Sequence, residues 1–257
     1  MGLTSQSSGL SLLKAKFNIQ RKSESQIVIA LAGNPNTGKS TLFNHLTGLN
    51  QHTGNWPGKT VANAQGTFTY KDKEFLLVDL PGTYSILASS VEEEVARDFI
   101  CFGNPNLTIV ITDATCLERN LNLALQVMEI TDNVIVCLNL MDEAERKGIY
   151  IDLKKLQEFL GVPVIPTVAK DGKGVDELLE VIHQFTENKL ELKPYKVKYE
   201  ESIETLVTQI EEKLTPIISD IFNTRWIGLR LLDGDEKILS TINSIINDSY
   251  EGGIDDE

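Results

Sequence analysis

The chain has 257 residues and a formal net charge of −13 at pH 7, from 24 basic and 37 acidic side chains. This acidity argues against a duplex nucleic-acid binder, which needs a basic surface to displace counterions, and it disfavours docking onto an anionic membrane. The length allows one large domain or one domain with an appendage, and the composition is ordinary for a globular protein.

The sequence gives no indication of a membrane span, a disulfide framework or a metal cluster. No stretch approaches the roughly 18 uncharged apolar residues expected of a transmembrane helix. The cysteines, Cys101, Cys116 and Cys137, are odd in number, which argues against disulfides and for a reducing compartment. Their apolar surroundings predict small buried hydrophobes rather than iron ligands. The three histidines share no spacing typical of a metal site.

Residues 1–25 are rich in serine with scattered basic residues, and they lack the apolar core of a signal peptide. We therefore expect a flexible tail there.

Residues 26–189 alternate between short apolar runs and stretches of helical periodicity. We expect strands at 27–31, 68–70, 75–78, 108–112, 134–138 and 162–165, and helices at 41–47, 117–128, 153–160 and 175–182. The apolar faces of two of these helices should carry Leu117, Leu121, Leu125 and Met128, and Leu153, Leu156, Phe159 and Leu160. Strands alternating with helices are typical of right-handed β-α-β units, so we predict an α/β fold with a mostly parallel sheet.

From residue 190 onward the strand signal fades and apolar residues recur at helical spacing. One such run extends up to Pro216 and includes Ile203 and Leu206, and others lie at 226–232 and 238–246. We expect a small all-helical domain at 190–250 and a frayed end at 251–257. Residues 190–257 hold 7 basic and 15 acidic side chains, a net charge of −8.

The strongest motif is a complete G-x-x-x-x-G-K-S sequence between a predicted strand and a predicted helix. Its residues are Gly33, Asn34, Pro35, Asn36, Thr37, Gly38, Lys39 and Ser40, with Thr41 next in the helix. Glycines let successive backbone N–H groups curl around a phosphate chain, and the helix N-terminus adds positive potential. Lys39 is expected to reach the β- and γ-phosphates, and the Ser40 hydroxyl to coordinate Mg²⁺. A glycine-rich turn without a ligand is much the weaker interpretation in this context.

The second motif is Asp79-Leu80-Pro81-Gly82, which follows the apolar run at 75–78. An aspartate at this strand end can hold the Mg²⁺ shell through water, and the Gly82 N–H can contact the γ-phosphate and sense hydrolysis. Alone this would be an aspartate before a turn. Some 40 residues after a phosphate-binding loop, it is a specific signal.

Two further motifs indicate guanine recognition. In Asn139-Leu140-Met141-Asp142, the Asp142 carboxylate can accept from guanine N1–H and the exocyclic amine, while Asn139 braces the loop. Leu140 replaces the usual lysine of an N-K-x-D motif. The weaker sequence Thr167-Val168-Ala169-Lys170 takes the place of an S-A-K loop, where the backbone N–H of Ala169 should make the base contact and Val168 stands in place of serine.

Residues 52–60 lie between the first helix and the next strand, where a GTPase keeps its first switch. Glycines and Pro57 predict a loop. Thr60 can close over the nucleotide and ligate Mg²⁺ through its hydroxyl. For Trp56 two interpretations remain open: an anchor onto the core, or a contact on the nucleotide side.

Together the motifs N-P-N-x-G-K-[ST], G-N-W-P-G-x-T, D-L-P-G-x-Y-S and N-x-M-D resemble the cytosolic G domain of the FeoB ferrous iron transporter family. The resemblance extends over roughly residues 27–248 and implies a Ras-like P-loop GTPase domain followed by a helical domain that restrains GDP release. It implies a membrane transport domain in the same polypeptide, a place at the cytoplasmic face of the membrane, GTP and GDP as ligands, and a possible homo-oligomer. It also implies slow, K⁺-stimulated hydrolysis, with Asn36 and the carbonyls of Gly54 and Trp56 as K⁺ ligands.

The sequence lacks one residue that Ras-like enzymes use. Thr83 stands where they place a glutamine to orient the attacking water, and no arginine finger is identifiable. We therefore expect catalysis to rest on positioning and cations, through Lys39, Thr60, Gly82 and a K⁺ held by Asn36 that neutralises developing charge.

Two alternatives remain open. One is a stand-alone GTPase of ribosome or RNA maturation, which would typically carry a basic RNA-binding domain rather than an appendage of net charge −8. The other is a nucleotide-binding switch in which hydrolysis is secondary.

Overall fold

The structure is a computed structural model that describes residues 17–48, 51–87, 89–218 and 222–251. Most of the predicted tail, residues 1–16, and most of the predicted frayed end, residues 252–257, lie outside the described residues.

The chain divides into two compact units. One comprises Gln20–Ile100 and Asn104–Lys196, and the other comprises Cys101–Gly103 and Val197–Glu257 together with Met1–Ile19. Residues 20–25, which were expected to belong to the tail, thus fall in the unit that contains the sheet. The linker after the last helix of that unit also belongs to it as far as Lys196, whereas the sequence suggested a boundary at 189.

Within the described residues the sheet has seven strands: β1 (Ile27–Gly33), β2 (Gln51–Asn55), β3 (Ala62–Tyr70), β4 (Lys73–Asp79), β5 (Leu107–Asp113), β6 (Val134–Asn139) and β7 (Val164–Pro166). Their order is β2-β3-β4-β1-β5-β6-β7. The β2–β3 and β3–β4 pairs are antiparallel, and the other neighbours are parallel. The predicted α/β fold with a mostly parallel sheet is confirmed.

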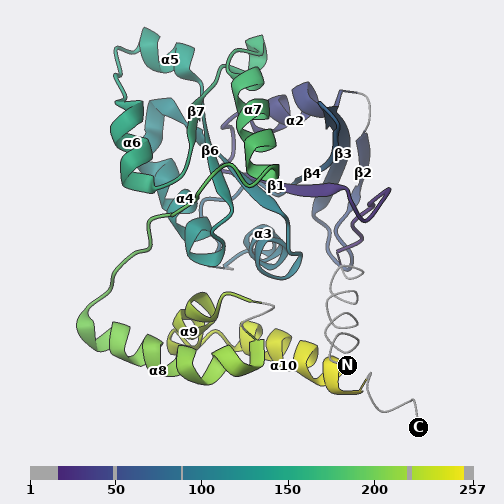
Figure 1. Ribbon diagram of the computed structural model, residues 1–257, viewed down its shortest axis with the longest axis vertical. Coiled ribbons are helices and arrows are strands. Elements are labelled where there is room, and N and C mark those ends of the chain that lie inside the picture. Colours follow the sequence, from purple (N-terminus) through teal and green to yellow (C-terminus); the bar gives the residue numbers. More distant parts are fainter. Residues whose placement is uncertain (1–16, 49–50, 88, 219–221, 252–257) are drawn as a thin grey trace. The chain divides into compact units, whose positions relative to one another are not determined.

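Helices cover both faces of the sheet (Figure 1). The helices are α2 (Lys39–Thr47), α3 (Val91–Phe102), α4 (Leu117–Ile130), α5 (Met141–Arg146), α6 (Leu153–Leu160) and α7 (Val175–Thr186). Apolar residues of α2 and α7 form one buried cluster with β1, β4, β5 and β6. On the opposite face, α4 packs on β5, β1 and β6. The carboxyl ends of β1 and β4, which pair in parallel, therefore lie beside the N-terminus of α2.

Strand β2 corrects the predicted loop in the first switch. It pairs with β3, with His52 opposite Gln65 and Gly54 opposite Asn63, so β3 also begins earlier than expected. The sequence Gln-His-Thr-Gly-Asn has no apolar alternation, and its last four residues are exposed. These residues form a strand because their backbone hydrogen-bonds to β3 at the edge of the sheet. The spacing of apolar residues in the sequence cannot reveal such pairing. Helix α3 was not predicted either.

Two predicted helical faces are wrong in detail. The buried face of α4 is formed not by Leu117, Leu121 and Leu125, which are half-buried, but by Asn120, Leu123, Ala124, Val127 and Met128. In α6, Phe159 is 59% exposed, and its ring stacks on Tyr195 of the linker at 5.2 Å. Phe159 packs against the linker, which is far from it in sequence. The helical periodicity of residues 153–160 could therefore not indicate this contact.

The second unit contains α8 (Glu201–Ile218), α9 (Thr224–Leu232) and α10 (Glu236–Glu251), which confirms the predicted helical domain. Helix α8 continues through Pro216 instead of ending there. Among the described side chains of this helix, Val207 and Ile218 are buried, whereas Ile203 and Leu206, which follow the predicted helical spacing, are exposed. Helix α9 packs closely on α8 at Gly228, where an added Cβ would lie 3.5 Å from the Ile210 side chain.

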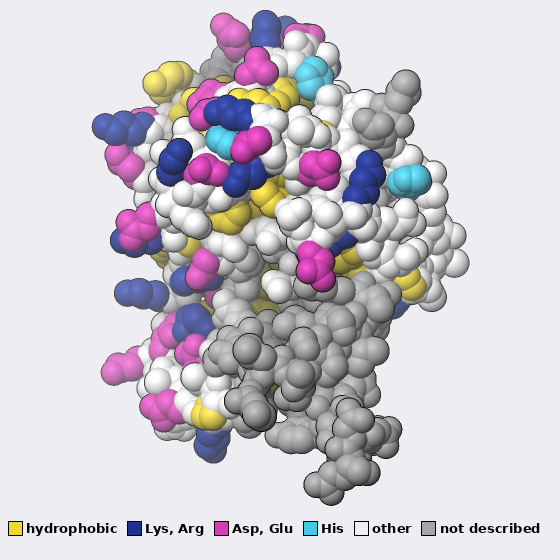
Figure 2. All heavy atoms as spheres, turned by 45° about the vertical axis from the view of Figure 1, so that its right-hand side comes forward, with side chains coloured by type: hydrophobic (Ala, Val, Ile, Leu, Met, Phe, Trp, Pro, Cys, Tyr) yellow, Lys and Arg dark blue, Asp and Glu magenta, His cyan; other side chains and the backbone are white. Residues whose placement is uncertain are grey.

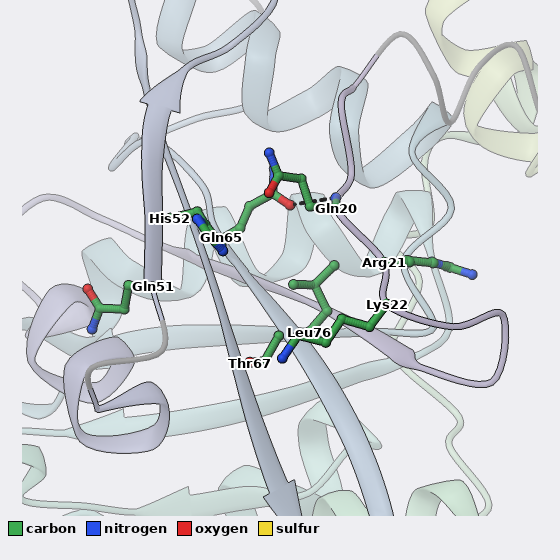
Figure 3. Close-up of a pocket in the computed structure, with 8 residues that line it drawn as sticks. All are labelled: Gln20, Arg21, Lys22, Gln51, His52, Gln65, Thr67 and Leu76. Carbon is green, nitrogen blue, oxygen red and sulfur yellow. Dashed lines mark hydrogen bonds between the residues drawn. The ribbon is translucent and has the colours of Figure 1, made fainter.

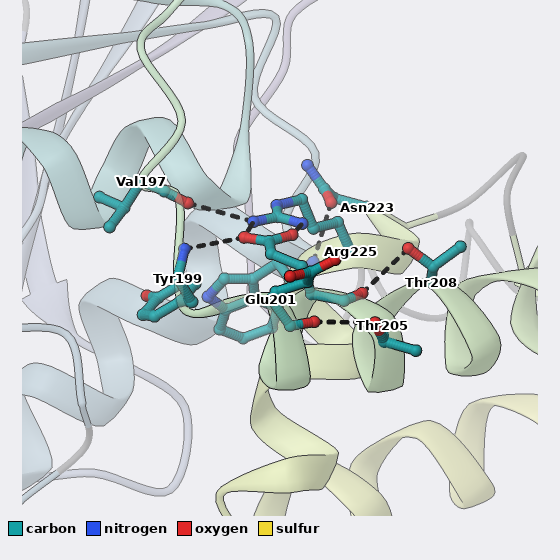
Figure 4. A network of polar contacts seen from close by, with 9 residues as sticks. Val197, Tyr199, Glu201, Thr205, Thr208, Asn223 and Arg225 are labelled. Atoms are coloured by element: carbon teal, nitrogen blue, oxygen red, sulfur yellow. Dashed lines mark hydrogen bonds and ion pairs between the residues drawn. The ribbon is translucent and has the colours of Figure 1, made fainter.

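A polar network fixes the start of this unit (Figure 4). The Arg225 guanidinium donates to both carboxylate oxygens of Glu204, at 2.8 and 2.9 Å, and to the Val197 carbonyl at 3.1 Å. Glu204 also accepts from the Tyr199 backbone N–H at 2.9 Å. One ion pair thus ties residues 197–199 to α8 and α9.

In the part of the chain that the structure describes, no helix combines the length and apolar character needed to cross a bilayer. Among the same residues no group of three or more His, Cys, Asp or Glu side chains could hold a metal ion. Cys101 and Cys137 are buried, but Cys116 is exposed, which corrects its prediction as a buried hydrophobe. On the face shown in Figure 2, acidic and basic side chains are interspersed.

Candidate functional site

The glycine-rich loop between β1 and α2 borders a cavity of about 570 Å³. The cavity is lined by Asn34, Pro35, Asn36, Gly38, Lys39, Ser40, Thr41 and Gly82. Glycine is required at two positions of the loop: Gly38 has a φ of +88°, and a Cβ at Gly33 would lie 2.8 Å from the Ile111 carbonyl oxygen. The structure therefore brings the phosphate-loop residues and Gly82 together around one space.

Lys39 and Asp79 form an ion pair beside this cavity, and their side chains are only 11% and 16% exposed. Burial raises the pKa of the Asp79 carboxyl, and the Lys39 ammonium opposes that shift. Asp79 ends β4, next to the first helical turn that carries Ser40. A carboxylate and a hydroxyl are hard oxygen donors of the kind that Mg²⁺ prefers, so the donor set fits that ion.

The segment after Asp79 lies against the phosphate loop. The Thr83 N–H donates to the Gly33 carbonyl at 3.2 Å, and a Cβ on Gly82 would lie 3.3 Å from Pro35 Cα. Thr83 is 5% exposed, and it is not among the residues that line the cavity.

Asn139 joins two loops that are far apart in sequence. Its Nδ2 donates to the Thr37 carbonyl at 2.8 Å, while its Oδ1 accepts from the Ala169 N–H at 2.9 Å and the Thr167 hydroxyl at 3.2 Å. The side chain is 1% exposed. The phosphate loop is thereby fixed relative to the loop after β7. The Ala169 N–H was expected to face a base. In the structure it donates to Asn139 Oδ1, and its contact with a base stays a prediction.

The Asp142 carboxylate lies in the first turn of α5, near the same loop. Its Oδ2 accepts from Lys170 Nζ at 2.6 Å, and this hydrogen bond holds the pKa of Asp142 below its ordinary value. Its Oδ1 is buried and has no hydrogen-bond partner among the described residues. Leu140 adopts a left-handed conformation, with φ of +63°, which is rare for a bulky residue and marks a constrained loop. The lysine that pairs with Asp142 comes from the loop after β7, a pairing that the sequence did not indicate. Val168, predicted as a nucleotide contact, is buried and its N–H donates to the Lys173 carbonyl.

Trp56 in the first switch is 2% exposed and meets Phe99 of α3 edge-on at 5.3 Å. Of the two interpretations, the structure supports the anchor onto the core. The Trp56 carbonyl accepts from the Lys59 N–H at 3.0 Å, Gly54 lies in β2, and Thr60 is exposed. The structure does not place Gly54, Trp56 or Thr60 among the residues that line the cavity.

A second cavity, of about 500 Å³, lies beside β2 and β3 (Figure 3). It is lined by Gln20, Arg21, Lys22, Gln51, His52, Gln65, Thr67 and Leu76. The Gln20 N–H donates to Gln65 Oε1 at 3.0 Å, which holds residues 20–22 along its edge. None of the predicted nucleotide or metal ligands lines this cavity.

A mostly parallel sheet, a phosphate-binding loop at the carboxyl end of β1 and a guanine-type motif at the end of β6 define a P-loop GTPase-type domain. The family model for ferrous iron transport protein B matches residues 27–182, and that for the FeoB cytosolic helical domain matches residues 199–252. The chain belongs to the FeoB family of ferrous iron transport proteins.

The Fe(2+) transporter FeoB of Escherichia coli K12 is 40% identical over 215 residues, which is 82% of this chain and 27% of that protein. A Porphyromonas gingivalis fusion of Fe(2+) transport protein A with FeoB is 36% identical over 231 residues, 88% of this chain and 27% of the fusion. The chain thus spans about a quarter of the length of the curated relatives that it matches.

Among solved structures, the cytosolic domain of T. maritima FeoB in GMPPNP form has a TM-score of 0.78 at 37% identity, covering 86% of each chain. Its GDP form II also gives 0.78, at 38% identity, again over 86% of each chain. The isolated G domain of that protein gives 0.60 at 43% identity and covers 63% of this chain and 99% of its own.

Proposed function

We propose that this chain binds guanine nucleotides and hydrolyses GTP slowly as the nucleotide-dependent, cytoplasmic part of a ferrous iron transporter. The observation that carries the proposal is the double contact of Asn139, which links the phosphate loop at Thr37 to the base loop at Ala169. This contact aligns the two halves of one ligand site, one suited to phosphates and one suited to a purine base.

Guanine preference follows from the state of Asp142. An aspartate is ionised at neutral pH, and the Lys170 hydrogen bond lowers the pKa of Asp142 further, so the carboxylate accepts hydrogen bonds without donating any. Guanine offers two adjacent donors, N1–H and the exocyclic amine, whereas adenine offers an acceptor at N1. The relatives solved in GDP and GMPPNP forms support the same assignment.

Mg²⁺ would be held by Ser40 and Asp79, with Thr60 joining when the first switch closes. It would supply charge neutralisation between the β- and γ-phosphates. The Lys39 ammonium now satisfies the Asp79 carboxylate, and we expect it to turn toward the phosphates when a nucleotide binds. Asp79 would then be free to face the metal's water shell.

K⁺ would be held by the Asn36 amide oxygen with the carbonyls of Gly54 and Trp56, a set of neutral oxygen donors. Asn36 lines the phosphate cavity, with φ of +65°. Because Thr83 is buried and does not line the cavity, a cation there would supply charge that Ras-like enzymes obtain from an arginine finger.

The partner that we propose is a membrane transport domain in the same polypeptide, since the relatives extend far beyond the matched region. The rival assignment, a stand-alone GTPase of RNA maturation, is not favoured by any feature of the described residues. Ferrous iron is the proposed cargo of the whole transporter.

The test is to measure affinity and turnover with GTP, GDP and ATP, each in K⁺ and in Na⁺. We expect micromolar or tighter binding of both guanine nucleotides, weak ATP binding, and faster GTP turnover in K⁺. Asn36→Ala should remove the difference between the two salts while leaving GDP affinity intact. Equal turnover in both salts for the wild type would contradict the K⁺ assignment, and tight ATP binding would contradict the guanine assignment.

A further inference from the structure

The switch-II segment, residues 82–87, is hydrogen-bonded to α4 through the Gln126 side chain. The Gln126 Oε1 accepts from the Ile86 backbone N–H at 2.8 Å and from the Ser85 hydroxyl at 3.1 Å. The Ser85 hydroxyl oxygen in turn accepts from the Leu87 N–H at 3.1 Å. The oxygen assignment of this amide is chemically fixed, because a backbone N–H can only donate.

The same segment is attached at its other end to the phosphate loop, through the Thr83 N–H and the Gly33 carbonyl. Only Tyr84 and Ser85 lie between Thr83 and Ile86. The hydrogen bond to β1 and the hydrogen bonds to Gln126 of α4 thus restrain this short segment from two sides, and with it the position of Gly82 against Pro35.

Helix α4 is a rigid support for that second contact. Leu123, Ala124 and Val127, which flank Gln126 on the helix, are 1%, 0% and 0% exposed. Tyr84 adds a further contact with the same helix, since the Arg119 guanidinium lies 4.2 Å from its ring centroid. Tyr84 is itself 45% exposed, so this contact restrains the segment less than the two hydrogen bonds to Gln126 do.

We propose that Gln126 is a positioning residue for GTP hydrolysis, which holds the segment after Gly82 in the path that presents the Gly82 N–H to the γ-phosphate. This inference rests on the proposed function. It assigns no contact between Gln126 and the nucleotide. Its effect is confined to the γ-phosphate side of the site, because GDP lacks the group that Gly82 would contact.

The variant Gln126→Ala removes both hydrogen bonds, and Gln126→Glu keeps an acceptor oxygen at the same reach. Asn122→Ala is the matched control, because Asn122 is an exposed amide one turn earlier on α4. We expect kcat for GTP to fall about three- to tenfold in Gln126→Ala, less than the full loss of two hydrogen bonds, because the segment keeps its contacts through Thr83 and Tyr84. GDP affinity should stay within about twofold, and Gln126→Glu and Asn122→Ala should behave like the wild type.

Hydrogen exchange supplies a readout that does not depend on turnover. The Ile86 amide should exchange faster in Gln126→Ala than in the wild type, while the amides of α4 remain protected. A parallel loss of GDP affinity and of α4 protection would reveal a general structural role and overturn the proposal. Unchanged kcat in Gln126→Ala would overturn it as well. A wild type that hydrolyses no GTP would contradict the proposed function itself. A wild type that hydrolyses GTP, together with an equally active Gln126→Ala, would contradict only the role of Gln126.

Discussion

Asn139 donates its side-chain amide to the carbonyl of Thr37, across 102 positions of sequence, and so joins the end of β6 to the phosphate loop. The same amide accepts from Ala169 and Thr167. We predict that Asn139→Ala weakens both GDP and GTP binding by about tenfold or more, since each lost contact of this kind contributes about 0.5–1.5 kcal/mol. Calorimetric titration with GDP measures the effect.

The variant Asn139→Asp tests the hydrogen bond to Thr37 separately from the hydrogen bonds to Ala169 and Thr167. It keeps an acceptor for Ala169 but turns an acceptor toward the Thr37 carbonyl, where the donor is needed. We expect it to bind GDP nearly as poorly as Asn139→Ala does. Wild-type affinity in Asn139→Asp would show that the bond to Thr37 contributes nothing to the site.

The Asp142 carboxylate predicts a change of base specificity. In Asp142→Asn the side chain can donate from its amide nitrogen, and xanthine presents a carbonyl oxygen where guanine has its exocyclic amine. We therefore expect Asp142→Asn to lose about tenfold to a hundredfold in GDP affinity and to gain affinity for XDP.

The control for that change is Glu145→Gln, which removes one negative charge from an exposed position of the same helix. It should leave both affinities unchanged. If Asp142→Asn bound GDP as tightly as the wild type, the carboxylate would not be the group that reads the base.

The parts of the site that the sequence could predict are those in which residue type dictates geometry. Gly33 and Gly38 permit a backbone that other residues resist, and Lys39 follows them in a spacing that few other structures require. The buried strands were predictable for a related reason, because a continuous apolar run of five residues has few alternatives to a central strand.

The parts that could not be predicted depend on neighbours distant in sequence. Strand β2 is polar throughout, and only its pairing with β3 makes it a strand. Nothing in the sequence distinguishes Gln126 from other glutamines. Its role is visible only in the fold, where the Ile86 backbone nitrogen lies 2.8 Å from Gln126 Oε1. Lys170 became the partner of Asp142 for the same reason, since the two are separated by 28 positions.

The Glu204–Arg225 pair predicts how the helical unit responds to acid. The hydrogen bonds from Arg225 lower the pKa of Glu204 from 4.5 to about 2. Because the folded pKa lies below the unfolded one, the stabilisation is fully present above pH 4.5 and is lost as the pH falls toward 2. The pair is partly exposed, which reduces the effect through solvent screening.

We therefore expect the thermal midpoint of the wild type to fall more steeply between pH 5 and pH 3 than that of Glu204→Gln, which has no carboxyl to protonate (the pH range is set about the ordinary glutamate pKa). Glu201→Gln is the control, since Glu201 is exposed and its hydrogen bond with the Thr205 hydroxyl is accepted by the backbone carbonyl, which the substitution keeps. Parallel curves for the wild type and Glu204→Gln would contradict the prediction.

The linker between the two units predicts where the chain can be shortened. Residues 193–196 belong to the unit that contains the sheet: the Lys193 N–H donates to Gly161, the Tyr195 N–H donates to Leu160 at 2.9 Å, and Lys196 pairs with Asp132 at 2.7 Å. Lys196 also donates to the Met128 carbonyl near the end of α4. A chain that ends after Lys196 keeps these contacts, and one that ends after Lys189 loses them.

We expect the chain 1–196 to fold and bind GDP, as the isolated G domain of the T. maritima relative yields a crystal structure. The chain 1–189 should unfold several degrees lower, because about 1 kcal/mol shifts the midpoint of a domain of this size by about 2–4 °C. If the helical unit restrains nucleotide release, GDP should dissociate faster from 1–196 than from the full chain in a stopped-flow displacement assay. An equal off-rate would identify residues 197–257 as a spacer, and equal stability of the two shortened chains would show that the linker contacts contribute nothing to the fold.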